Sequence, residues 1–374
     1  MSSRTVIMGV GDIMVSRDDP PTAFTLVKPL FDSADIVFGN CESVYATTGS
    51  RNPATRGEVR GEPSNVAGLA YAGFDIMSLA NNHTLDSGYE AFFETKDHLT
   101  EHGIATCGAG KDLEQSRRPV VVDHDGTKVA FLAYSTVMFP GYESALGKPG
   151  CTQINVFTHY TMSEIEQPGC EAKVATVVDP ASLRMLREDV ERAREIADIV
   201  VVTPHWGIHF TPVEIADYET ELAHRAIDYG ADLVLGHHQH ILKGIQVYKG
   251  KVIFHGLGNF VMDVAQTRLS GPGVKAMQAN NPTYAVGNYP DYPTYPFHPE
   301  ARQTVVAKAV VEDRSITAVS FVPCLINQGG QPEPLRDGDP RFDEVAQYQQ
   351  LISKEAGFET NFAPAGDEVL VTGS

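Results

Sequence analysis

The sequence predicts an α/β protein with mixed sheets, and three observations lead to this prediction. Short buried apolar runs alternate with amphipathic helical patterns along most of the chain, and hairpin patterns follow them. That order is typical of a layered α/β fold. The 374 residues, 42% hydrophobic and 21% charged, supply enough apolar material for a large core. No apolar run approaches the roughly 18–20 residues that a membrane-spanning helix needs.

The first part of the chain predicts strands that end in polar clusters. A β-branched or apolar run bounded by polar residues indicates a buried strand, and three such runs occur early. They are Thr5–Val10, Asp35–Phe38 and Phe74–Leu79. Gly88–His102 has the apolar spacing of an amphipathic helix and is followed by Gly103 at the C-cap position. We therefore expect a helix after the third strand.

The second part predicts further helix–strand units and then hairpins. Asp125-Gly126 separates two strand-like runs, which is a strong hairpin signal. The expected elements are the hairpin Val120–Val122 with Lys128–Tyr134, the helices Pro180–Ala197 and Glu214–Tyr229, the strands Ile199–Thr203 and Asp232–Leu235, and the hairpins Gly244–Val247 with Lys251–His255 and Thr304–Val311 with Ser315–Val322.

No repeat or break in composition divides the chain, so we expect a single domain over residues 1–374. A polar loop covers Arg51–Pro63, and a longer loop rich in aromatic residues and proline covers 266–299. A loop of that length inside a compact domain is usually functional or disordered, and aromatic residues interleaved with prolines favour an ordered loop, so we expect it to border the active site. The last hairpin and a tail occupy 303–374.

Charge and cysteine content narrow the partners. Lys plus Arg is 29 and Asp plus Glu is 48, a net charge of −19, which disfavours nucleic acid and membrane surfaces as partners and favours cations or peptides. The N-terminus lacks a basic stretch followed by an apolar core, and the five cysteines are widely spaced. These features predict a cytoplasmic protein without disulfides or zinc–thiolate sites, and they leave the oligomeric state open.

Polar side chains follow five of the expected strands. Parallel strands of an α/β sheet present their carboxyl ends at one edge, where ligands bind, so these side chains should converge. A lone Asp after a strand is usually a turn former or helix cap, but three imidazoles in four positions favour a metal or catalytic role. The residues concerned are Asp12, Asn40, Glu42, Asn81, Asn82, His83, Asp86, His205, His237, His238 and His240.

The order of these motifs resembles that of the CapA family, which is associated with poly-γ-glutamate synthesis and belongs to the calcineurin-like metallophosphatase superfamily. The matching segments lie within residues 5–262; they are Gly11-Asp12-Ile13-Met14, Asn40-Cys41-Glu42, Asn81-Asn82-His83-Thr84-Leu85-Asp86-Ser87-Gly88, His205-Trp206-Gly207, Gly236-His237-His238-Gln239-His240 and Leu257-Gly258-Asn259-Phe260. The resemblance implies a calcineurin-like four-layer α/β/β/α sandwich. It also implies a divalent metal, for which Ca, Mn, Zn and Mg are the candidates, held by Asp12, Glu42, Asn82, His205, His238 and His240.

Departures from the family pattern favour one metal with proton-transfer pairs over a two-metal phosphatase site. Met14 stands where such phosphatases place a His, and Asn40 or Glu42 stands where they place a bridging Asp. His209 and His255 replace a Glu and a Tyr that are common in CapA proteins. A pair of metals clamping an in-line phosphoryl transfer is therefore harder to build from these residues.

Two enzyme classes follow from the resemblance, with a non-catalytic export module as a third reading. The first is a metal-dependent peptide epimerase that inverts a Cα centre of a ribosomal, lasso-type precursor peptide by two-base His/Asp chemistry. The alternative is a metal-dependent phosphoesterase or amide hydrolase. One acid–base pair would be His83 with Asp86, and the other would be Asp12 with His238, His240, His255 or His298. The peptide would contact Trp206, His209, His255 and Tyr295.

Overall fold

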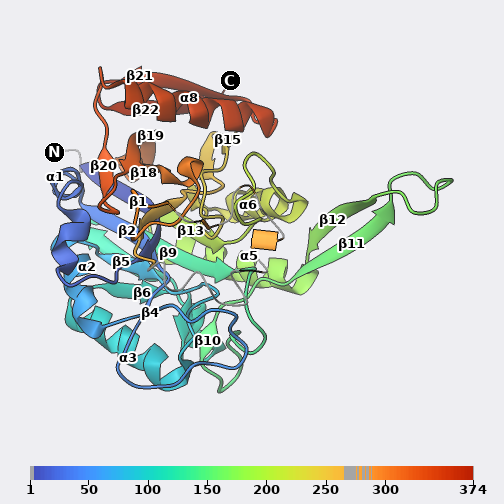
Figure 1. Ribbon diagram of the computed structural model, residues 1–374, viewed down its shortest axis with the longest axis horizontal. Coiled ribbons are helices and arrows are strands. Elements are labelled where there is room, and N and C mark those ends of the chain that lie inside the picture. The colour runs from blue at the N-terminus through green and yellow to red at the C-terminus, as the bar shows by residue number, and fades with distance from the viewer. Residues whose placement is uncertain are drawn as a thin grey trace.

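Two large mixed β-sheets form the centre of the molecule, and helices lie on their outer sides (Figure 1). The computed structural model describes residues 4–264, 275, 278–279, 283, 286–287 and 289–373. Most of the loop predicted at 266–299 before residue 289 lies outside the described residues. Among the described residues, no helix is long and apolar enough to cross a membrane.

The first sheet has ten strands in the order β21-β22-β19-β18-β1-β2-β5-β6, with β17 beside β1 and β20 beside β19. Strands β1, β2, β5, β6 and β17 are parallel, and β18 runs antiparallel to β1. The bounds are β1 Arg4–Met14, β2 Ile36–Cys41, β5 Ile76–Ser78, β6 Ala105–Cys107, β17 Asn259–Met262, β18 Gln303–Glu312, β19 Ser315–Ile326, β20 Pro332–Pro334, β21 Thr360–Ala365 and β22 Glu368–Gly373.

The second sheet has six strands in the order β15-β16-β14-β13-β9-β8. Its four central strands are parallel, and the two edge strands are antiparallel to their neighbours. The bounds are β8 Val120–His124, β9 Thr127–Ser135, β13 Ile199–His205, β14 Leu233–Leu235, β15 Ile245–Tyr248 and β16 Lys251–Phe254. The expected strand positions are therefore confirmed in both sheets.

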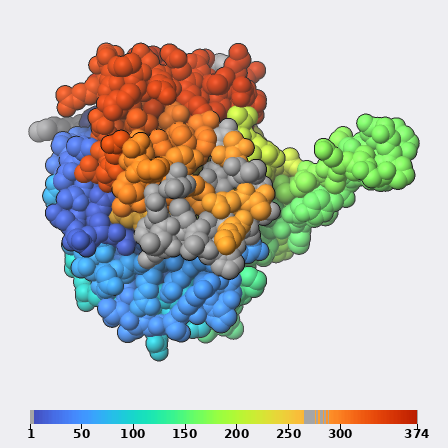
Figure 2. Space-filling model, in the orientation of Figure 1, coloured from blue at the N-terminus to red at the C-terminus, as the bar shows by residue number. Residues whose placement is uncertain are grey.

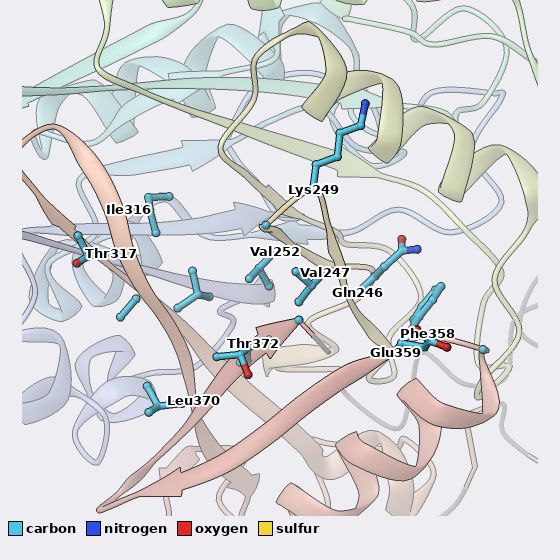
Figure 3. A pocket seen from close by; sticks show the side chains of 16 residues that line it. Gln246, Val247, Lys249, Val252, Ile316, Thr317, Phe358, Glu359, Leu370 and Thr372 are labelled. Carbon is cyan, nitrogen blue, oxygen red and sulfur yellow. The ribbon is translucent and has the colours of Figure 1, made fainter.

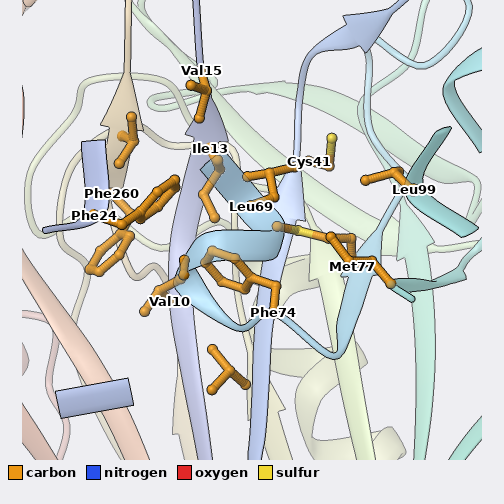
Figure 4. Packing of buried hydrophobic residues seen from close by; sticks show 14 of the residues in the cluster. Val10, Ile13, Val15, Phe24, Cys41, Leu69, Phe74, Met77, Leu99 and Phe260 are labelled. Carbon is orange, nitrogen blue, oxygen red and sulfur yellow. The ribbon is translucent and has the colours of Figure 1, made fainter. Parts of the chain in front are cut away.

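Three apolar cores hold the layers together. One core lies between the sheets, where Phe38 of β2 stacks on Phe131 of β9 with ring centroids 5.3 Å apart. A second joins the first sheet to its helices, as Leu69 and Phe74 show beside Met77 (Figure 4). A third joins the second sheet to α5 and α6. This arrangement confirms the predicted four-layer α/β/β/α sandwich with mixed sheets.

The helices of the outer layers begin and end close to the predicted positions, with one shift. The helix expected from Glu214 begins at Asp217, because a carboxylate oxygen of Glu219 accepts the Ala216 N–H at 2.8 Å and so defines the helix start. The α-helices are α1 Lys28–Phe31, α2 Val66–Ala72, α3 Gly88–Glu101, α4 Leu113–Ser116, α5 Pro180–Ile196, α6 Asp217–Tyr229 and α8 Pro340–Glu355. The 3₁₀ helices are η1 Pro20–Phe24, η2 Pro63–Asn65 and η4 Pro299–Arg302.

A two-stranded arm that the sequence did not reveal projects from the body (Figures 1 and 2). Its strands, β11 Val156–Met162 and β12 Ala172–Val178, form a two-stranded sheet with each other and pair with no other described strand. Tyr160 is 72% exposed and Val174, directly opposite it, is 60% exposed. Shorter pairs join β3 Val44–Tyr45 to β4 Arg60–Gly61 and β7 Ala109–Gly110 to β10 Gly150–Cys151.

The tail after the last predicted hairpin is folded against the sheets. Helix α8 packs on β19, and the hairpin β21–β22 extends the first sheet through Ser320 and Phe321 of β19. The Gln349 side chain of α8 donates to the carbonyl of Lys243 at 2.7 Å. The tail therefore contacts the loop that follows the second sheet's histidine segment. All five cysteines are free thiols.

Candidate metal centre and active site

Strand ends from both sheets converge on one buried polar cluster. Asp12 lies near the end of β1 and His205 at the end of β13, while Glu42 follows β2. Asn82 follows β5, and His238 and His240 follow β14. The structure thus brings together all six side chains that the resemblance implied as metal ligands, and each is less than 10% exposed.

Close backbone approach and unusual backbone angles shape this cluster. A Cβ on Gly11 would lie 2.0 Å from the carbonyl oxygen of Gly258, so only glycine permits the Asp12 N–H to bond that carbonyl at 3.0 Å. His238 and His240 have backbone φ values of 98° and 56°, which residues other than glycine rarely adopt. Such strain is maintained where the surrounding structure demands it, commonly at functional sites.

Asp12 lies at the centre of the cluster. Its Oδ1 accepts the Asn40 amide at 2.8 Å, and its Oδ2 accepts the backbone N–H of His238 at 3.1 Å. The Nδ1 of His240 lies 3.4 Å from Asp12 Oδ2 and 2.8 Å from Asn259 Oδ1. Of the four histidines considered as partners for Asp12, His240 is therefore the one whose ring lies within ion-pair distance.

Glu42 and His205 complete a compact set of donors with Asp12. One atom from each of these three side chains lies within 4.8 Å of the others. His205 Nε2 is 3.6 Å from Glu42 Oε1, 2.7 Å from Asn82 Oδ1 and 3.1 Å from His238 Nδ1. Asn82 and His238 thus contact the Asp12, Glu42 and His205 triad through His205.

The electrostatics of the cluster indicate that it lacks a positive charge. Burial, and then the charges of Asp12 and Asp86, hold the pKa of Glu42 well above its usual range. Burial and neighbouring imidazoles hold the pKa values of His205 and His238 well below theirs. The imidazoles are therefore neutral at pH 7 and present lone pairs.

These donors fit a divalent cation. Glu42 Oε1 is buried and has no hydrogen-bond partner among the described residues. Two carboxylates and one imidazole within 4.8 Å match the oxygen and nitrogen donors that Mn and Zn accept, and the carboxylates also suit Ca and Mg. A cation placed among them would satisfy the orphan oxygen and favour the ionised carboxylate. The Asp/Glu/His triad is therefore a possible metal site.

A fourth imidazole stacks on the two histidines of the β14 segment. The His209 ring lies 3.9 Å from the His238 ring and 5.3 Å from the His240 ring, centroid to centroid. His209 is partly exposed, unlike its two neighbours, and its Nε2 has no hydrogen-bond partner in the described part of the chain. Of the four predicted substrate contacts, His209 is therefore the one that lies at the cluster and is not fully buried.

His83 and Asp86 form a carboxylate–imidazole pair beside the cluster. His83 Nδ1 lies 2.8 Å from Asp86 Oδ2, and its Nε2 lies 3.2 Å from the Asn82 amide. Asp86 is fully buried and also accepts the Tyr142 hydroxyl at 3.0 Å and the Val59 N–H at 2.9 Å. Asp86 therefore holds the His83 ring in a defined orientation, while 16% of the His83 side chain remains exposed.

The other three side chains predicted to contact a peptide are fully buried. Trp206 donates its Nε1–H to the His255 carbonyl at 2.7 Å, and the two rings stack. Burial lowers the pKa of His255 to about 3, so this ring is neutral. The Tyr295 hydroxyl accepts the Asn259 amide at 2.8 Å. In this structure Trp206, His255 and Tyr295 support the site from behind and have no surface for a substrate.

His298 lies in the loop that the sequence analysis placed at the active site. Its Nδ1 accepts the Glu300 N–H at 3.2 Å and so caps helix η4. The same loop reaches the cluster through Phe297, whose ring centroid is 5.9 Å from that of His240. The described end of the loop therefore packs on the histidine cluster. The histidine found within ion-pair distance of Asp12 is His240.

Three residues that support the site were not predicted as site residues from the sequence. Tyr142 fixes Asp86 from 56 positions away, and Lys243 lies buried under the loop that carries His209. Asn259 orients His240 and occurs in one of the family motifs, so its role as a ligand-orienting residue could have been read there. A groove of about 920 Å³ between β15, β19 and β22 includes none of the site residues in its lining (Figure 3).

The fold and the cluster together define an α/β/β/α sandwich with a possible metal site at its strand ends. The sequence matches the bacterial capsule synthesis protein family, PGA_cap, over residues 6–264. The chain belongs to this family, which confirms the resemblance to CapA drawn from the motifs. The match ends close to β17, so α8 and the hairpin β21–β22 lie outside it.

The relatives carry the names of capsule proteins. The chain is 29% identical over 269 residues to the PGA biosynthesis protein CapA of Bacillus subtilis, covering 69% of this chain and 63% of that protein. It is 28% identical over 270 residues to the capsule biosynthesis protein CapA of Bacillus anthracis, covering 69% and 60%. The chain therefore spans about three fifths of the length of these curated relatives.

One solved structure with a distantly similar fold is named as a calcineurin-like phosphoesterase. The calcineurin-like phosphoesterase YfkN of Bacillus subtilis aligns with a TM-score of 0.42 and 12% identity, covering 96% of this chain and all of that chain. A likeness this distant does not bear on activity. The relatives' names support the CapA-type assignment and not the narrower lasso-peptide epimerase.

Proposed function

We propose that this protein is a metal-dependent hydrolase of the CapA type that cleaves a phosphoester or an amide bond. The observation that carries the proposal is the buried Asp12, Glu42 and His205 triad with an orphan oxygen on Glu42. A divalent cation held by these three side chains would supply Lewis-acid stabilisation of negative charge on a phosphoryl or carbonyl oxygen. Asn82 and His238, both in contact with His205, would complete its surroundings.

His83 is the residue that we assign to proton transfer. Its Nδ1 is held by Asp86 at 2.8 Å, which leaves Nε2 on the side of Asn82 and the cluster. A carboxylate in that position fixes the tautomer and stabilises the imidazolium that forms when the ring takes a proton. The substrate we propose is a peptide or peptide-like molecule, since the net charge of −19 disfavours nucleic acid and membranes.

A second candidate function is Cα epimerisation of a ribosomal, lasso-type precursor peptide. It is favoured by two carboxylate–imidazole pairs at one site, His83 with Asp86 at 2.8 Å and His240 with Asp12 at 3.4 Å. Inversion at carbon needs one group to remove a proton and another to deliver one. Met14, at the end of β1, also stands where the resemblance to two-metal phosphatases implies a histidine ligand.

Incubation in D₂O separates these functions. The metal-loaded protein is incubated with bis-p-nitrophenyl phosphate and with a set of short peptides, and products are followed by absorbance and mass spectrometry. We expect bond cleavage that is lost on chelation and restored by one of Ca, Mn, Zn or Mg. Elemental analysis of the purified protein gives the metal content.

The matched variants are Glu42→Gln and Glu195→Gln. Glu195 is exposed on α5, so its substitution should leave metal content and activity unchanged, whereas Glu42→Gln should lose both. Incorporation of deuterium at one Cα without bond cleavage would contradict the hydrolase proposal and support the epimerase. Full activity of metal-free protein would contradict a metal-dependent reaction of either kind.

A further inference from the structure

Arg302 ends helix η4, directly after the aromatic loop, and no carboxylate side chain of the described residues forms an ion pair with it. Its guanidinium carbon lies 3.6 Å from the ring centroid of Tyr292 and 5.2 Å from that of Tyr289. The side chain is half-buried, and its Nε–H is buried without a hydrogen-bond acceptor among the described residues. A cation stacked on aromatic faces is held in place while its N–H edge remains able to bind an anion.

No carboxylate side chain in the described part of the chain binds the N–H edge of Arg302. Among the described residues, no Asp or Glu lies within ion-pair distance of Arg302, and none of the undescribed residues is an Asp or Glu. Glu300, in the same helix, accepts the Tyr348 hydroxyl of α8 at 3.0 Å. In a protein with 48 acidic and 29 basic residues, a half-buried arginine without an acidic partner is an unexpected arrangement.

Arg302 is joined to the catalytic cluster by a short series of contacts. The Tyr295 N–H bonds the Tyr292 carbonyl at 3.1 Å, and the Tyr295 hydroxyl bonds Asn259, which in turn bonds His240. Burial raises the pKa of Tyr295, the Arg302 charge opposes this rise, and the Asp12 charge adds to it. The contacts from Arg302 through Tyr292 and Tyr295 to Asn259 place Arg302 on the side of the cluster next to the aromatic loop.

We propose that Arg302 is a substrate-binding residue that takes a carboxylate of the substrate. The inference rests on the proposed function, because it names the chemical class of group that a substrate of this site carries. A planar guanidinium binds a carboxylate through two parallel N–H···O bonds. The single positive charge of the guanidinium balances a single carboxylate. The two tyrosines add apolar area for an aromatic or aliphatic group beside the carboxylate.

Benzoate and its neutral isostere benzamide test this binding without reference to turnover. Each is titrated into ¹⁵N-labelled metal-loaded protein and followed by NMR, with inorganic phosphate as a third ligand. The variants are Arg302→Gln, Arg302→Lys and, as a control, Arg314→Gln. Arg314 lies in the turn between β18 and β19, its side chain is 69% exposed, and its Nε lies 3.6 Å from Asp198 Oδ1. Thermal unfolding shows whether each variant is folded.

We expect wild-type protein to bind benzoate at least tenfold more tightly than benzamide, because charge-assisted bonds are the stronger ones. This ratio should fall to about one in Arg302→Gln, take an intermediate value in Arg302→Lys, and be unchanged in Arg314→Gln. A ratio that survives in folded Arg302→Gln places the carboxylate at the metal site and overturns the inference. Phosphate binding tighter than benzoate and lost in Arg302→Gln also overturns it.

A substrate pair separates this inference from the proposed function. Peptides that the protein turns over are compared with a free and with an amidated C-terminus. The free acid should have a KM about tenfold lower in wild type, and the two KM values should be equal in Arg302→Gln with kcat little changed. Equal KM values in wild type contradict the carboxylate subsite and leave the hydrolase standing. Absence of any turnover, with benzoate binding intact, contradicts the hydrolase alone.

Discussion

Glu42 is buried beside Asp12, and this proximity determines the electrostatics of the site. Bringing two carboxylates together in a place that water does not reach raises the pKa of Glu42, because its ionised form loses solvation and faces a like charge. The unpartnered Oε1 and the neutral imidazoles around it make a cation the natural counterpart. A few buried side chains thus specify the kind of group that the site can hold.

Asp86→Asn is the substitution that examines proton transfer most directly. An amide can keep its oxygen on Val59 N–H and His83 and donate its NH₂ to the Tyr142 hydroxyl, so the hydrogen bonds survive while the charge is lost. We expect activity to fall by about 10²–10⁴-fold, because the imidazolium of His83 loses its stabilising carboxylate. Steady-state kinetics at several pH values measures the loss.

The matched control is Asp97→Asn. Asp97 is exposed on α3, so this substitution should change neither the activity nor the free energy of unfolding. The free energy of unfolding of Asp86→Asn should drop by no more than about 1 kcal/mol, as expected when hydrogen bonds are retained. A stability loss of several kcal/mol with unchanged kcat per folded molecule would make Asp86 a structural residue only.

At the scale of elements, the loop 207–216 between β13 and α6 shows how a strained segment is held over the site. Phe210 and Val213 have φ values of 50° and 66°, and a β-branched residue is rarely found there. The Lys243 ammonium is fully buried beneath this loop and donates to the carbonyls of Thr211 and Glu214, the latter at 2.6 Å. Lys243 therefore holds the segment that places His209 on the other imidazoles.

Replacing Lys243 by Met should release this loop. The two carbonyls would lose their buried donor, at about 1–3 kcal/mol each, partly offset because the buried charge is also removed. We expect a net loss of about 2 kcal/mol in the free energy of unfolding and a rise in KM, because the His209 ring is no longer held on His238. Urea denaturation and kinetics measure the two effects. Lys249→Met, at an exposed position, is the control.

Metal content provides the second readout for Lys243→Met. Lys243 contacts the His209 loop and not the Asp12, Glu42 and His205 triad, so metal bound per protein should stay near the wild-type value. A parallel loss of metal and stability would show that the substitution disturbs the whole cluster rather than the loop.

At the scale of the whole molecule, buried ionisable groups make stability depend on pH. Burial raises the pKa of Glu219 from 4.5 to about 7, since this carboxylate lies under the histidine segment with Gln239 as its side-chain donor. Burial also lowers the pKa of Lys243 from 10.5 to about 8. Both groups are buried in the folded protein and exposed in the unfolded chain, so their titration changes the free energy of unfolding.

The free energy of unfolding should fall as pH rises from about 4.5 to about 7. In that window the folded protein binds more protons at Glu219 than the unfolded chain does, and stability decreases with pH wherever this holds. A shift from 4.5 to about 7 corresponds to about 3 kcal/mol. Urea denaturation of wild type and Glu219→Gln between pH 5 and pH 7.5 measures this, and the variant should show a flatter profile.

Two further measurements test whether the pH dependence of the free energy of unfolding arises from Glu219. Glu221→Gln, two positions further along the same helix, should retain the wild-type slope. Lys243 acts in the opposite sense above about pH 8, where the unfolded chain binds more protons, so stability should rise with pH there. An identical slope in wild type and Glu219→Gln would show that this carboxylate is ionised throughout the range.

Local patterns in the sequence predicted all six strands of the second sheet, the strands β1, β2, β5, β18 and β19 of the first sheet and the helices α3, α5 and α6, but not the β11–β12 arm or α8. Periods of two and of 3.6 residues depend on neighbours in the chain. Asp12, near the end of β1, and Glu42, after β2, converge because these parallel strands of one sheet end at the same edge. His205 ends a strand of the other sheet and reaches them only because the two sheets pack together. The CapA resemblance rested on the same segments and is confirmed by the family match over residues 6–264.

Contacts between distant residues were decided only by the tertiary structure. It placed the His240 ring next to Asp12, Tyr142 on Asp86, and Lys243 beneath the His209 loop. It also buried Trp206 behind the cluster and extended the β11–β12 arm into solvent. These features depend on which surfaces meet when the layers pack, and packing joins side chains whose separation along the chain carries no periodic signal.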